Sequence, residues 1–254
     1  MAIFTFAIRK GGVGKSSSAA DLALYLAQRG RRVLAIDLDP QCNLTTRLGI
    51  PMVNDLAAVA ADVLPGSTSL TDAAVPSPRI DGVHVIAGSE DLADLENRPE
   101  ILMSLRNQLR ADIDGLWDDV VIDTSTFPGL VTQTGLAAAD QVIAPIDCAG
   151  EALLALAFLE GLIDRKLVKT RLLPAFGVSW VIPTCFHIGH TLDQQVLEQL
   201  RASYGHRVTP TIREAAAVRQ SFVAQMPVSL YDPKSNVAGD YTAVFDHITQ
   251  DQEF

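Results

Sequence analysis

A glycine-rich stretch separates the first strand-like run of the chain from its first helix-like run. The apolar residues Ile3–Ile8 precede the letters KGGVGKS at residues 10–16, and the stretch Ser16–Arg29 then repeats alanine and leucine at helical spacing. Glycines let a loop turn tightly so that its N–H groups point inward, and a helix that starts there adds the positive end of its dipole. The sequence therefore predicts a strand–loop–helix unit that binds phosphate groups.

Strand-like and helix-like runs alternate along the whole chain. Five further strand candidates are short, continuous apolar runs: Val33–Ile36, Val83–Ile86, Asp119–Ile122, Val142–Ile146 and Gly177–Ile182. Continuous rather than alternating apolar strands indicate a sheet that is covered on both faces. The pattern predicts an α/β fold with a doubly wound, mostly parallel sheet flanked by helices. We expect a single domain over residues 1–254, without an N-terminal helix-turn-helix domain, and a surface loop at Pro65–Arg79.

Charge and composition narrow the function classes. The net charge of −10 argues against a constitutive nucleic-acid binder. Residues 165–254 nevertheless carry nine basic and eight acidic residues, so any DNA-facing surface is expected in this last third. Three distant cysteines indicate a reducing compartment rather than a disulfide framework. With no secretory signal and no apolar run long enough for a membrane span, we expect a cytoplasmic protein without membrane contact.

The residue types of the loop predict ATP and Mg²⁺ as cofactors. Lys15 is expected to neutralise the β- and γ-phosphates, and the Ser16 hydroxyl is expected to bind Mg²⁺. A glycine-rich turn with incidental lysines is the alternative, and the strand–loop–helix context counts against it. The expected nucleotide contacts are the loop residues themselves: Lys10, Gly11, Gly12, Val13, Gly14, Lys15, Ser16 and Ser17.

Carboxylates follow two of the later strand candidates. Asp37 and Asp39 come directly after Val33–Ile36, and Asp123 closes the run VVI. Side chains beyond the carboxyl ends of parallel strands point into one crevice. Asp123 is expected to hold Mg²⁺ through water and Asp37 to support the same metal shell. An exposed Asp-Pro turn and a helix-capping aspartate are the structural alternatives.

Several motifs resemble one family of ATPases. The ordinary phosphate-loop pattern has glycine where Arg9 stands, whereas this chain carries a second lysine, Lys10. This arrangement resembles the deviant Walker A family, which includes ParA, MinD and the nitrogenase iron protein. Residues Asp37–Asn43 resemble its DxDPQxN motif, with Cys42 where glycine is usual, and Met226–Tyr241 is similar to the tail of ParA-type members. The resemblance to ParA-type (Soj-like) DNA partition ATPases spans nearly the whole chain.

The resemblance implies an ATP hydrolase with Lys10, Lys15 and Asp39 as its catalytic residues. In the family, the first lysine reaches across a nucleotide-sandwich homodimer to the partner's phosphates, which assigns that role to Lys10. Asp39 falls where family members position the attacking water. Residues Thr124–Gly129 lack the two prolines that are usual after the Walker B aspartate, which leaves the metal role of Asp123 intact.

The same resemblance implies a cellular function, the partition of DNA. An ATP-dependent homodimer is expected to coat non-specific double-stranded DNA, to associate with the nucleoid, and to leave the DNA on hydrolysis. A ParB-like centromere-binding partner would stimulate turnover that is slow by itself, because no arginine finger is evident. Loops after the later strands are expected to hold adenine, with Thr184 and Pro210 as the named positions. The expected DNA contacts are basic residues of the last third: Arg201, Arg213, Arg219 and Lys234.

The spacing of Cys185, His187 and His190 is that of a possible metal site. No fourth ligand or second cluster accompanies the three residues in the sequence. A loop with incidental histidines is therefore the favoured interpretation.

Four rival functions share the fold. A MinD-like membrane ATPase would end in a basic amphipathic helix, whereas residues 249–254 are polar and acidic. An enzyme like the nitrogenase iron protein needs paired cysteines that Cys148 and Cys185 do not match, and biotin-pathway synthetases lack the lysine at Lys10. A positioning ATPase for a non-DNA cargo differs only in its partner and remains the alternative.

Overall fold

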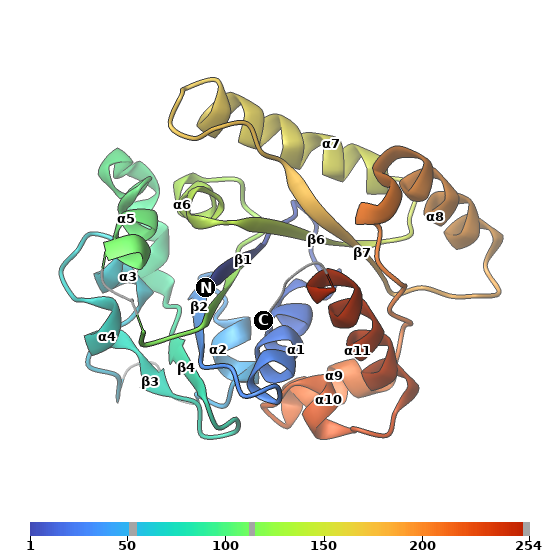
Figure 1. The fold of residues 1–254 in the computed structure, drawn as a ribbon, viewed down its shortest axis with the longest axis horizontal. Helices are drawn as coiled ribbons and strands as arrows, with labels where there is room; N and C mark the ends of the chain where they lie inside the picture. The colour runs from blue at the N-terminus through green and yellow to red at the C-terminus, as the bar shows by residue number, and fades with distance from the viewer. Residues whose placement is uncertain (51–54, 112–114, 251–254) are drawn as a thin grey trace.

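The computed structural model describes residues 1–50, 55–111 and 115–250, and its centre is a sheet with helices on both faces (Figure 1). Within these residues the sheet has seven strands, which are in chain order β1 (Ala2–Phe6), β2 (Val33–Leu38), β3 (Val75–Pro76), β4 (Val83–Ile86), β5 (Asp119–Thr124), β6 (Gln141–Asp147) and β7 (Val178–Thr184). Across the sheet they run β3-β4-β2-β5-β1-β6-β7, and only β3 and β4 pair antiparallel. The predicted doubly wound, mostly parallel fold is confirmed.

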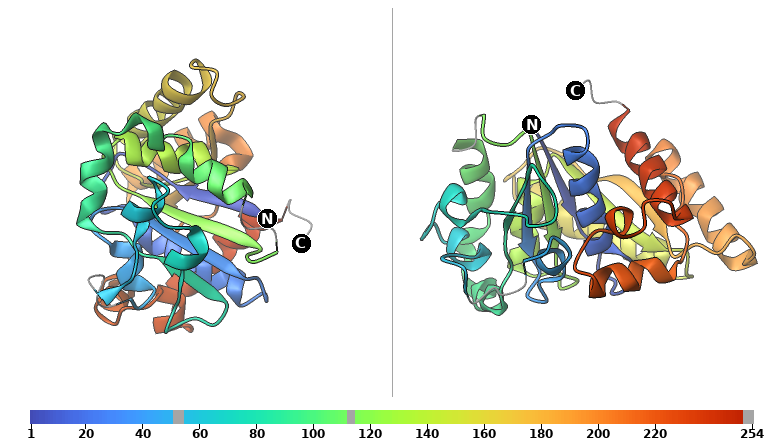
Figure 2. Two further views of the ribbon diagram at one scale, coloured as in Figure 1. Left: turned by 90° about the vertical axis from the view of Figure 1, so that its left-hand side faces the viewer. Right: turned by 90° about the horizontal axis from the view of Figure 1, so that it is seen from below.

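The helices cover both faces of the sheet, as the two side views in Figure 2 also show. The α-helices are α1 (Lys15–Ala27), α2 (Asn43–Arg47), α3 (Ala60–Val63), α4 (Leu70–Ala73), α5 (Ser104–Ala111), α6 (Leu130–Ala138), α7 (Ala152–Ile163), α8 (Thr191–Tyr204), α9 (Ala216–Val223), α10 (Val228–Tyr231) and α11 (Asn236–Thr249). Short 3₁₀ or π segments are η2 (Glu90–Asn97), η3 (Pro99–Ile101), η4 (Asp164–Val168) and η5 (Gly205–Arg207). No helix among the described residues is long and apolar enough to cross a membrane.

Alternating side chains of the central strand β1 serve the two cores. Phe4 and Phe6 are fully buried in a cluster with residues of α1 and α11, whereas Ile3 is buried with residues of α3 and α5 on the opposite face. The hydroxyl of Thr5 donates to the carbonyl of Gly135 in α6 at 3.0 Å. Because neither face of β1 meets water, its sequence is a continuous apolar run rather than an alternating one.

Glycines in the left-handed backbone region lie on either side of helix α1. Gly14 precedes the helix at φ 78° and Gly30 follows it at φ 78°, conformations that cost a residue with a side chain more than they cost glycine. The small residues Ala19, Ala20 and Ala23 are completely buried, so the helix lies close against the sheet. The predicted helix is confirmed within one or two residues at each end.

The expected loop at Pro65–Arg79 was wrong in part, because this segment contains the one-turn helix α4 and the edge strand β3. The Ser69 hydroxyl accepts a hydrogen bond from the N–H of Asp72 at 3.1 Å and so caps α4. Pro76 lies opposite His84 in the pairing of β3 with β4. Proline has no N–H to donate, which a strand at the edge of a sheet tolerates.

The register of the central strands brings three loops to one edge of the sheet. Asp123 of β5 lies opposite both Phe6 of β1 and Asp37 of β2, and Thr124 lies opposite Leu38. The segments that follow these strands therefore leave the sheet side by side. The glycine-rich loop and the acidic residues that sequence motifs placed far apart meet at this edge.

Candidate nucleotide site

The loop between β1 and α1 has the backbone that phosphate binding requires. Gly12 and Gly14 lie at φ 76° and φ 78°, where a side chain would be strained. Val13 between them is buried, and its carbonyl accepts a hydrogen bond of 2.9 Å from the Thr184 hydroxyl at the end of β7. The end of β7, in the C-terminal half of the chain, therefore supports the loop.

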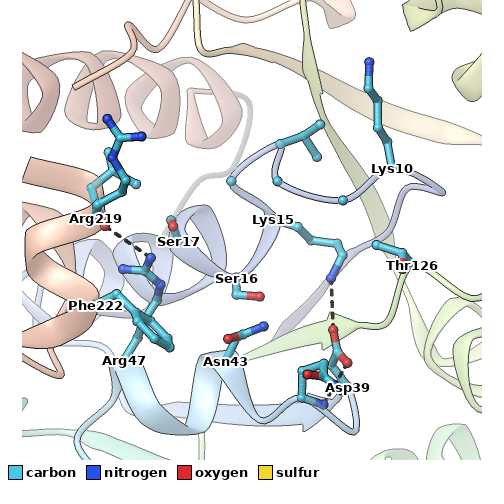
Figure 3. A pocket seen from close by; sticks show the side chains of 16 residues that line it. Lys10, Lys15, Ser16, Ser17, Asp39, Asn43, Arg47, Thr126, Arg219 and Phe222 are labelled. Atoms are coloured by element: carbon cyan, nitrogen blue, oxygen red, sulfur yellow. Dashed lines mark hydrogen bonds and ion pairs between the residues drawn. The ribbon is translucent and has the colours of Figure 1, made fainter. Parts of the chain in front are cut away.

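Lys15 at the start of α1 is buried and points at carboxylates. Its ammonium lies 3.9 Å from Asp39 Oδ2 (Figure 3). The ammonium also lies 3.1 Å from Asp123 Oδ1 and donates to the carbonyl of Thr124. The side chain is only 6% exposed, so its charge is held in a site largely closed to water. The site thus holds a cation directly after the glycine-rich loop, and hydrogen bonds between a lysine and a phosphate are among the strong, charge-assisted ones.

Asp123 offers a free carboxylate oxygen. The residue is fully buried, and its Oδ2 atom has no hydrogen-bond partner in the described structure. Burial raises the pKa of Asp123, while the charge of Lys15 and the hydroxyl of Ser16 lower it. A buried, unpartnered oxygen beside a serine hydroxyl fits a Mg²⁺ ion with its water shell, because Mg²⁺ takes oxygen ligands.

Asp37 fastens the loop that follows β2. One carboxylate oxygen accepts from the N–H of Asp39 at 3.1 Å, and the other accepts from the N–H and hydroxyl of Thr45 at 2.8 and 2.7 Å. The Thr45 hydroxyl in turn accepts from the N–H of Gly88 at 3.0 Å, which ties this loop to the end of β4. Burial, with the nearby Asp123, raises the pKa of Asp37 to about 7. Because both oxygens are engaged, the expected metal-shell role of Asp37 stays a prediction.

Asp39 lines the cavity beside Lys15. Its Oδ1 atom accepts from the N–H of Gln41 at 3.0 Å, which leaves Oδ2 on the Lys15 side. Cys42 follows at φ 53°, in the left-handed region where a residue other than glycine is strained. The backbone therefore explains why glycine would be easier at this position, and it holds Asp39 in a bent loop.

A cavity of about 520 Å³ opens above the loop. Its walls come from the loop, the segment after β2, α2, Thr126 and α9: Lys10, Gly11, Gly12, Val13, Gly14, Lys15, Ser16, Ser17, Asp39, Gln41, Asn43, Arg47, Thr126, Val218, Arg219 and Phe222. Every predicted loop contact lines it, and so does Asp39. The predicted adenine residues Thr184 and Pro210 do not: Thr184 supports Val13 from behind, and Pro210 is exposed. Their contact with adenine stays a prediction.

Sequence reasoning missed the wall formed by α2 and α9. The Arg47 guanidinium donates to the Ser221 hydroxyl at 3.0 Å and to the Val218 carbonyl at 3.3 Å. It also lies over the ring of Phe222, 5.1 Å from the ring centroid. These contacts join residues about 170 positions apart in the chain, and no local sequence motif predicts them.

Lys10 points away from Lys15 (Figure 3). Its ammonium lies 2.7 Å from Asp147 Oδ1 at the end of β6, and the two side chains are 22% and 29% exposed. A second cavity, of about 540 Å³, begins at Lys10 and runs along α7, where Glu151 and Leu154 line it. Leu154 is 73% exposed, so an apolar side chain is accessible to solvent at the cavity that Lys10 also lines.

The four predicted DNA contacts lie in different settings. Arg201 on α8 and Lys234 between α10 and α11 are exposed. Arg213 donates to both carboxylate oxygens of Asp240, at 2.6 and 2.8 Å. Arg219 lies at the nucleotide cavity. The structure leaves Arg201 and Lys234 freer for phosphates than the other two, and all four remain predictions.

Comparison with known proteins gives the family. A family model described as an AAA domain matches residues 1–172. The chromosome partitioning protein ParA of Caulobacter vibrioides is 33% identical over 240 residues, which cover 91% of this chain and 88% of that protein. The chain belongs to the ParA-type ATPases.

Two solved structures resemble this ParA-type chain. A Borrelia burgdorferi protein described as a plasmid partition protein, bound to AMPPNP, superposes with a TM-score of 0.83 at 21% identity and covers 98% of both chains. Cobyrinic acid a,c-diamide synthase of Mycobacterium smegmatis, with bound ADP and magnesium, has a TM-score of 0.74 at 29% identity and covers 89% of this chain and 91% of that one. The first likeness shows the fold, and family membership makes this chain an ATPase.

Proposed function

We propose that this ParA-type ATPase partitions DNA, either a chromosome or a plasmid. A single-domain chain dimerises when it binds ATP, coats double-stranded DNA without sequence preference and leaves the DNA on hydrolysis. The observation that carries the proposal is the opposite direction of two lysines in one loop. Lys15 is buried against carboxylates inside the site, whereas Lys10 is directed outward to a partly exposed surface.

ATP and Mg²⁺ are the cofactors of the enzyme. Lys15 and the loop N–H groups bind the phosphates, while Ser16 and Asp123 hold the metal, with Asp37 fixing the surrounding shell. When bound, Mg²⁺ neutralises charge that develops on the phosphate oxygens. Asp39 lines the cavity and orients the attacking water with its Oδ2 atom, which lies on the Lys15 side, because its Oδ1 atom already accepts the N–H of Gln41.

The dimer forms on the face that carries Lys10. In the monomer Lys10 is paired with Asp147, and a partly exposed ion pair is worth only a fraction of about 1 kcal/mol. Moving the ammonium to a phosphate of a partner's ATP therefore costs little. The exposed Leu154 and the cavity along α7 supply apolar surface next to the same lysine.

A ParB-like protein stimulates hydrolysis. The cavity contains two arginines, but Arg47 is engaged by Ser221 and Val218, and Arg219 lies with it on the α9 side in Figure 3. Neither is directed at the Lys15 end, where charge would develop on the γ-phosphate. Unstimulated turnover is therefore slow, since a free arginine accelerates phosphoryl transfer strongly.

DNA binding in different nucleotide states tests the proposal. Binding to a long non-specific duplex is measured with ATP, with ADP and without nucleotide, at low and moderate salt. We expect binding with ATP alone, weakened by Lys15→Ala and by Arg201→Ala. Arg98→Ala is the matched control, because Arg98 is an exposed arginine of the acidic N-terminal part. Dimerisation doubles the phosphate contacts, so binding is expected to fall steeply with salt.

The alternative is a positioning ATPase for a non-DNA cargo. The net charge of −10 and the neutralisation of Arg213 by Asp240 favour it. Absence of DNA binding in every nucleotide state, with ATP hydrolysis intact, would overturn the partition proposal and favour this one. Equal binding with ATP, with ADP and without nucleotide would also contradict the proposed cycle.

A further inference from the structure

Two histidines and an aspartate meet outside the nucleotide cavity. His187 and His190 lie in the loop between β7 and α8, and Asp193 lies in the first turn of α8. One ligand atom from each of the three side chains lies within 4.8 Å of the others. The sequence spacing suggested Cys185 as the third ligand, whereas the cluster that the structure assembles contains Asp193.

The side chains of this cluster face one another. Asp193 Oδ2 lies 3.4 Å from His187 Nδ1, and Asp193 Oδ1 lies 3.8 Å from His190 Nδ1. The two imidazole rings are stacked, with centroids 4.4 Å apart and planes inclined by 20°. Asp193 is fixed because its Oδ2 atom also accepts the N–H of His187 at 2.8 Å. The Nδ1 atoms of both histidines thus converge on one anchored carboxylate.

A second carboxylate occupies the far side of His187. Glu214 Oε2 lies 2.8 Å from His187 Nε2, and Glu214 belongs to the segment before α9. A histidine that donates from Nε2 to a carboxylate keeps its proton there and leaves the Nδ1 lone pair free. Histidines that ligate metals are held in this way by a carboxylate on the other nitrogen. The Nδ1 lone pair then faces the Asp193 carboxylate, an arrangement that a cation between them would stabilise.

We propose that His187, His190 and Asp193 bind a divalent transition metal ion of the zinc class, with Glu214 orienting His187. Two imidazoles and one carboxylate, with a fourth position open to water, suit Zn²⁺ and Co²⁺. Ligand atoms at metal distances of about 2.0–2.1 Å are about 3.3 Å apart in a tetrahedron, so the two stacked rings must turn out of their parallel arrangement until both Nδ1 lone pairs point at one ion. The two histidine side chains are 41% and 62% exposed, which leaves them free to make those rotations.

Charge at the site favours the ion despite the neighbouring helix. The N-terminus of α8 carries a partial positive charge, which disfavours a cation. Two carboxylates, Asp193 and Glu214, lie at the site, and their negative charge outweighs a partial charge of about half a unit. The alternative without a metal is a protonated His187 bridged by the two carboxylates, and metal titration distinguishes the two.

Metal at this cluster would link three segments. The N–H of Phe186 donates to the carbonyl of Ile212 at 3.0 Å, so the His187 loop already runs beside the chain that leads to Glu214. Thr184, three residues before His187, holds the carbonyl of Val13 in the phosphate loop. An ion on His187, His190 and Asp193 would therefore brace the strand end that supports that loop.

Cobalt titration tests the site. Tag-free, nucleotide-free protein is stripped with a chelator and titrated with Co²⁺ in excess Mg²⁺, which keeps the oxygen ligands near Asp123 occupied by a hard ion. We expect one equivalent with the visible absorption of tetrahedral Co²⁺, displaced by Zn²⁺. The double variant His187→Ala/His190→Ala should lose this absorption. Glu214→Gln should weaken Co²⁺ binding about tenfold, because it removes the carboxylate behind His187.

Two control variants separate this cluster from other ligands. His206→Ala removes an exposed histidine elsewhere, and Cys185→Ser removes the sulfur of the alternative ligand set; both should bind Co²⁺ as the unmodified chain does. Unchanged binding in the double variant, loss of binding in either control, or no absorption at millimolar Co²⁺ would each overturn the proposal. Far-ultraviolet circular dichroism of every variant confirms that the fold is retained.

Discussion

The phosphate loop carries two lysines in opposite settings. Lys15 lies on the inner wall of the loop, against the carboxylates of the nucleotide cavity, and Lys10 lies on its outer rim, beside Asp147. Lys15 on the inner wall is 6% exposed and is surrounded by Asp123, Asp39 and a carbonyl. Lys10 on the outer rim has a single ion-pair partner among the described residues and is 22% exposed. Burial makes an ion pair expensive to break, whereas a partly exposed pair exchanges partners at little cost. The difference suits a fixed phosphate ligand on one side and a movable one on the other.

Removing the inner lysine should have the largest effect. Lys15→Ala leaves buried carboxylates without their cation, so we expect the free energy of unfolding to fall by about 3 kcal/mol. ATP hydrolysis should fall by at least about 100-fold, because the variant lacks the cation that we propose binds the transferred phosphate. Urea unfolding and a phosphate-release assay measure both, and Lys15→Met, which keeps the aliphatic stem, separates charge from packing. Hydrolysis within tenfold of the unmodified rate would refute the role of Lys15 as a phosphate ligand.

The pH dependence of stability should come next. The pKa of Asp37 is raised to about 7 by burial and by Asp123, against 3.8 for an ordinary aspartate. The folded chain therefore holds a proton that the unfolded chain releases between about pH 4 and pH 7, so this contribution to stability is lost as pH rises. The slope reaches at most about 1.4 kcal/mol per pH unit. Asp37→Asn should gain stability relative to the unmodified chain from pH 5 to pH 7, measured by urea unfolding without nucleotide.

Asp118→Asn is the matched control for that titration. Asp118 pairs with Arg32 at 2.7 Å, which lowers its pKa, so its proton is absent from both states over the same range. The difference between Asp118→Asn and the unmodified chain should stay flat from pH 5 to pH 7. A flat difference for Asp37→Asn as well would mean that Asp37 is ionised throughout.

The support beneath the loop should have a smaller effect. Thr184→Val keeps the shape of the side chain but removes the donor to the Val13 carbonyl, which loses about 1 kcal/mol. We expect ATP binding to weaken about fivefold, which fluorescence of a labelled ATP analogue measures. Thr184→Ser keeps the hydroxyl and should bind normally. Equal weakening in both variants would show that the methyl group, not the hydrogen bond, is what matters.

Changing the outer lysine should alter the monomer least. Lys10→Ala removes a partly exposed ion pair, so the free energy of unfolding should change by less than about 1 kcal/mol. ATP binding by the monomer should stay nearly unchanged, while sedimentation with AMPPNP should show the loss of dimer. Lys166→Ala, an exposed lysine beyond α7, should dimerise normally. A normal dimer in Lys10→Ala would contradict the proposed difference in role between Lys15 and Lys10.

Local motifs made the central site predictable. The loop residues, Asp39 and Asp123 are each set by a strand that ends beside them, and parallel strands end at one edge. The α9 wall could not be foreseen, because Val218 and Ser221 meet Arg47 through contacts across the fold. The pairing of Arg213 with Asp240 is equally long-range. Short motifs thus predicted residues that line one cavity, and tertiary packing decided which of the predicted basic residues remain exposed.

The hydrogen bond from Thr184 to the phosphate loop also determines when, during synthesis, the site can be completed. Synthesis reaches the glycine-rich loop about 170 residues before Thr184, and it reaches the α9 wall later still. A nascent chain therefore carries the loop without its supporting hydrogen bond until Thr184 has been made. ATP can stabilise the folded form only after both of these parts have been made, because a ligand stabilises only the state that binds it.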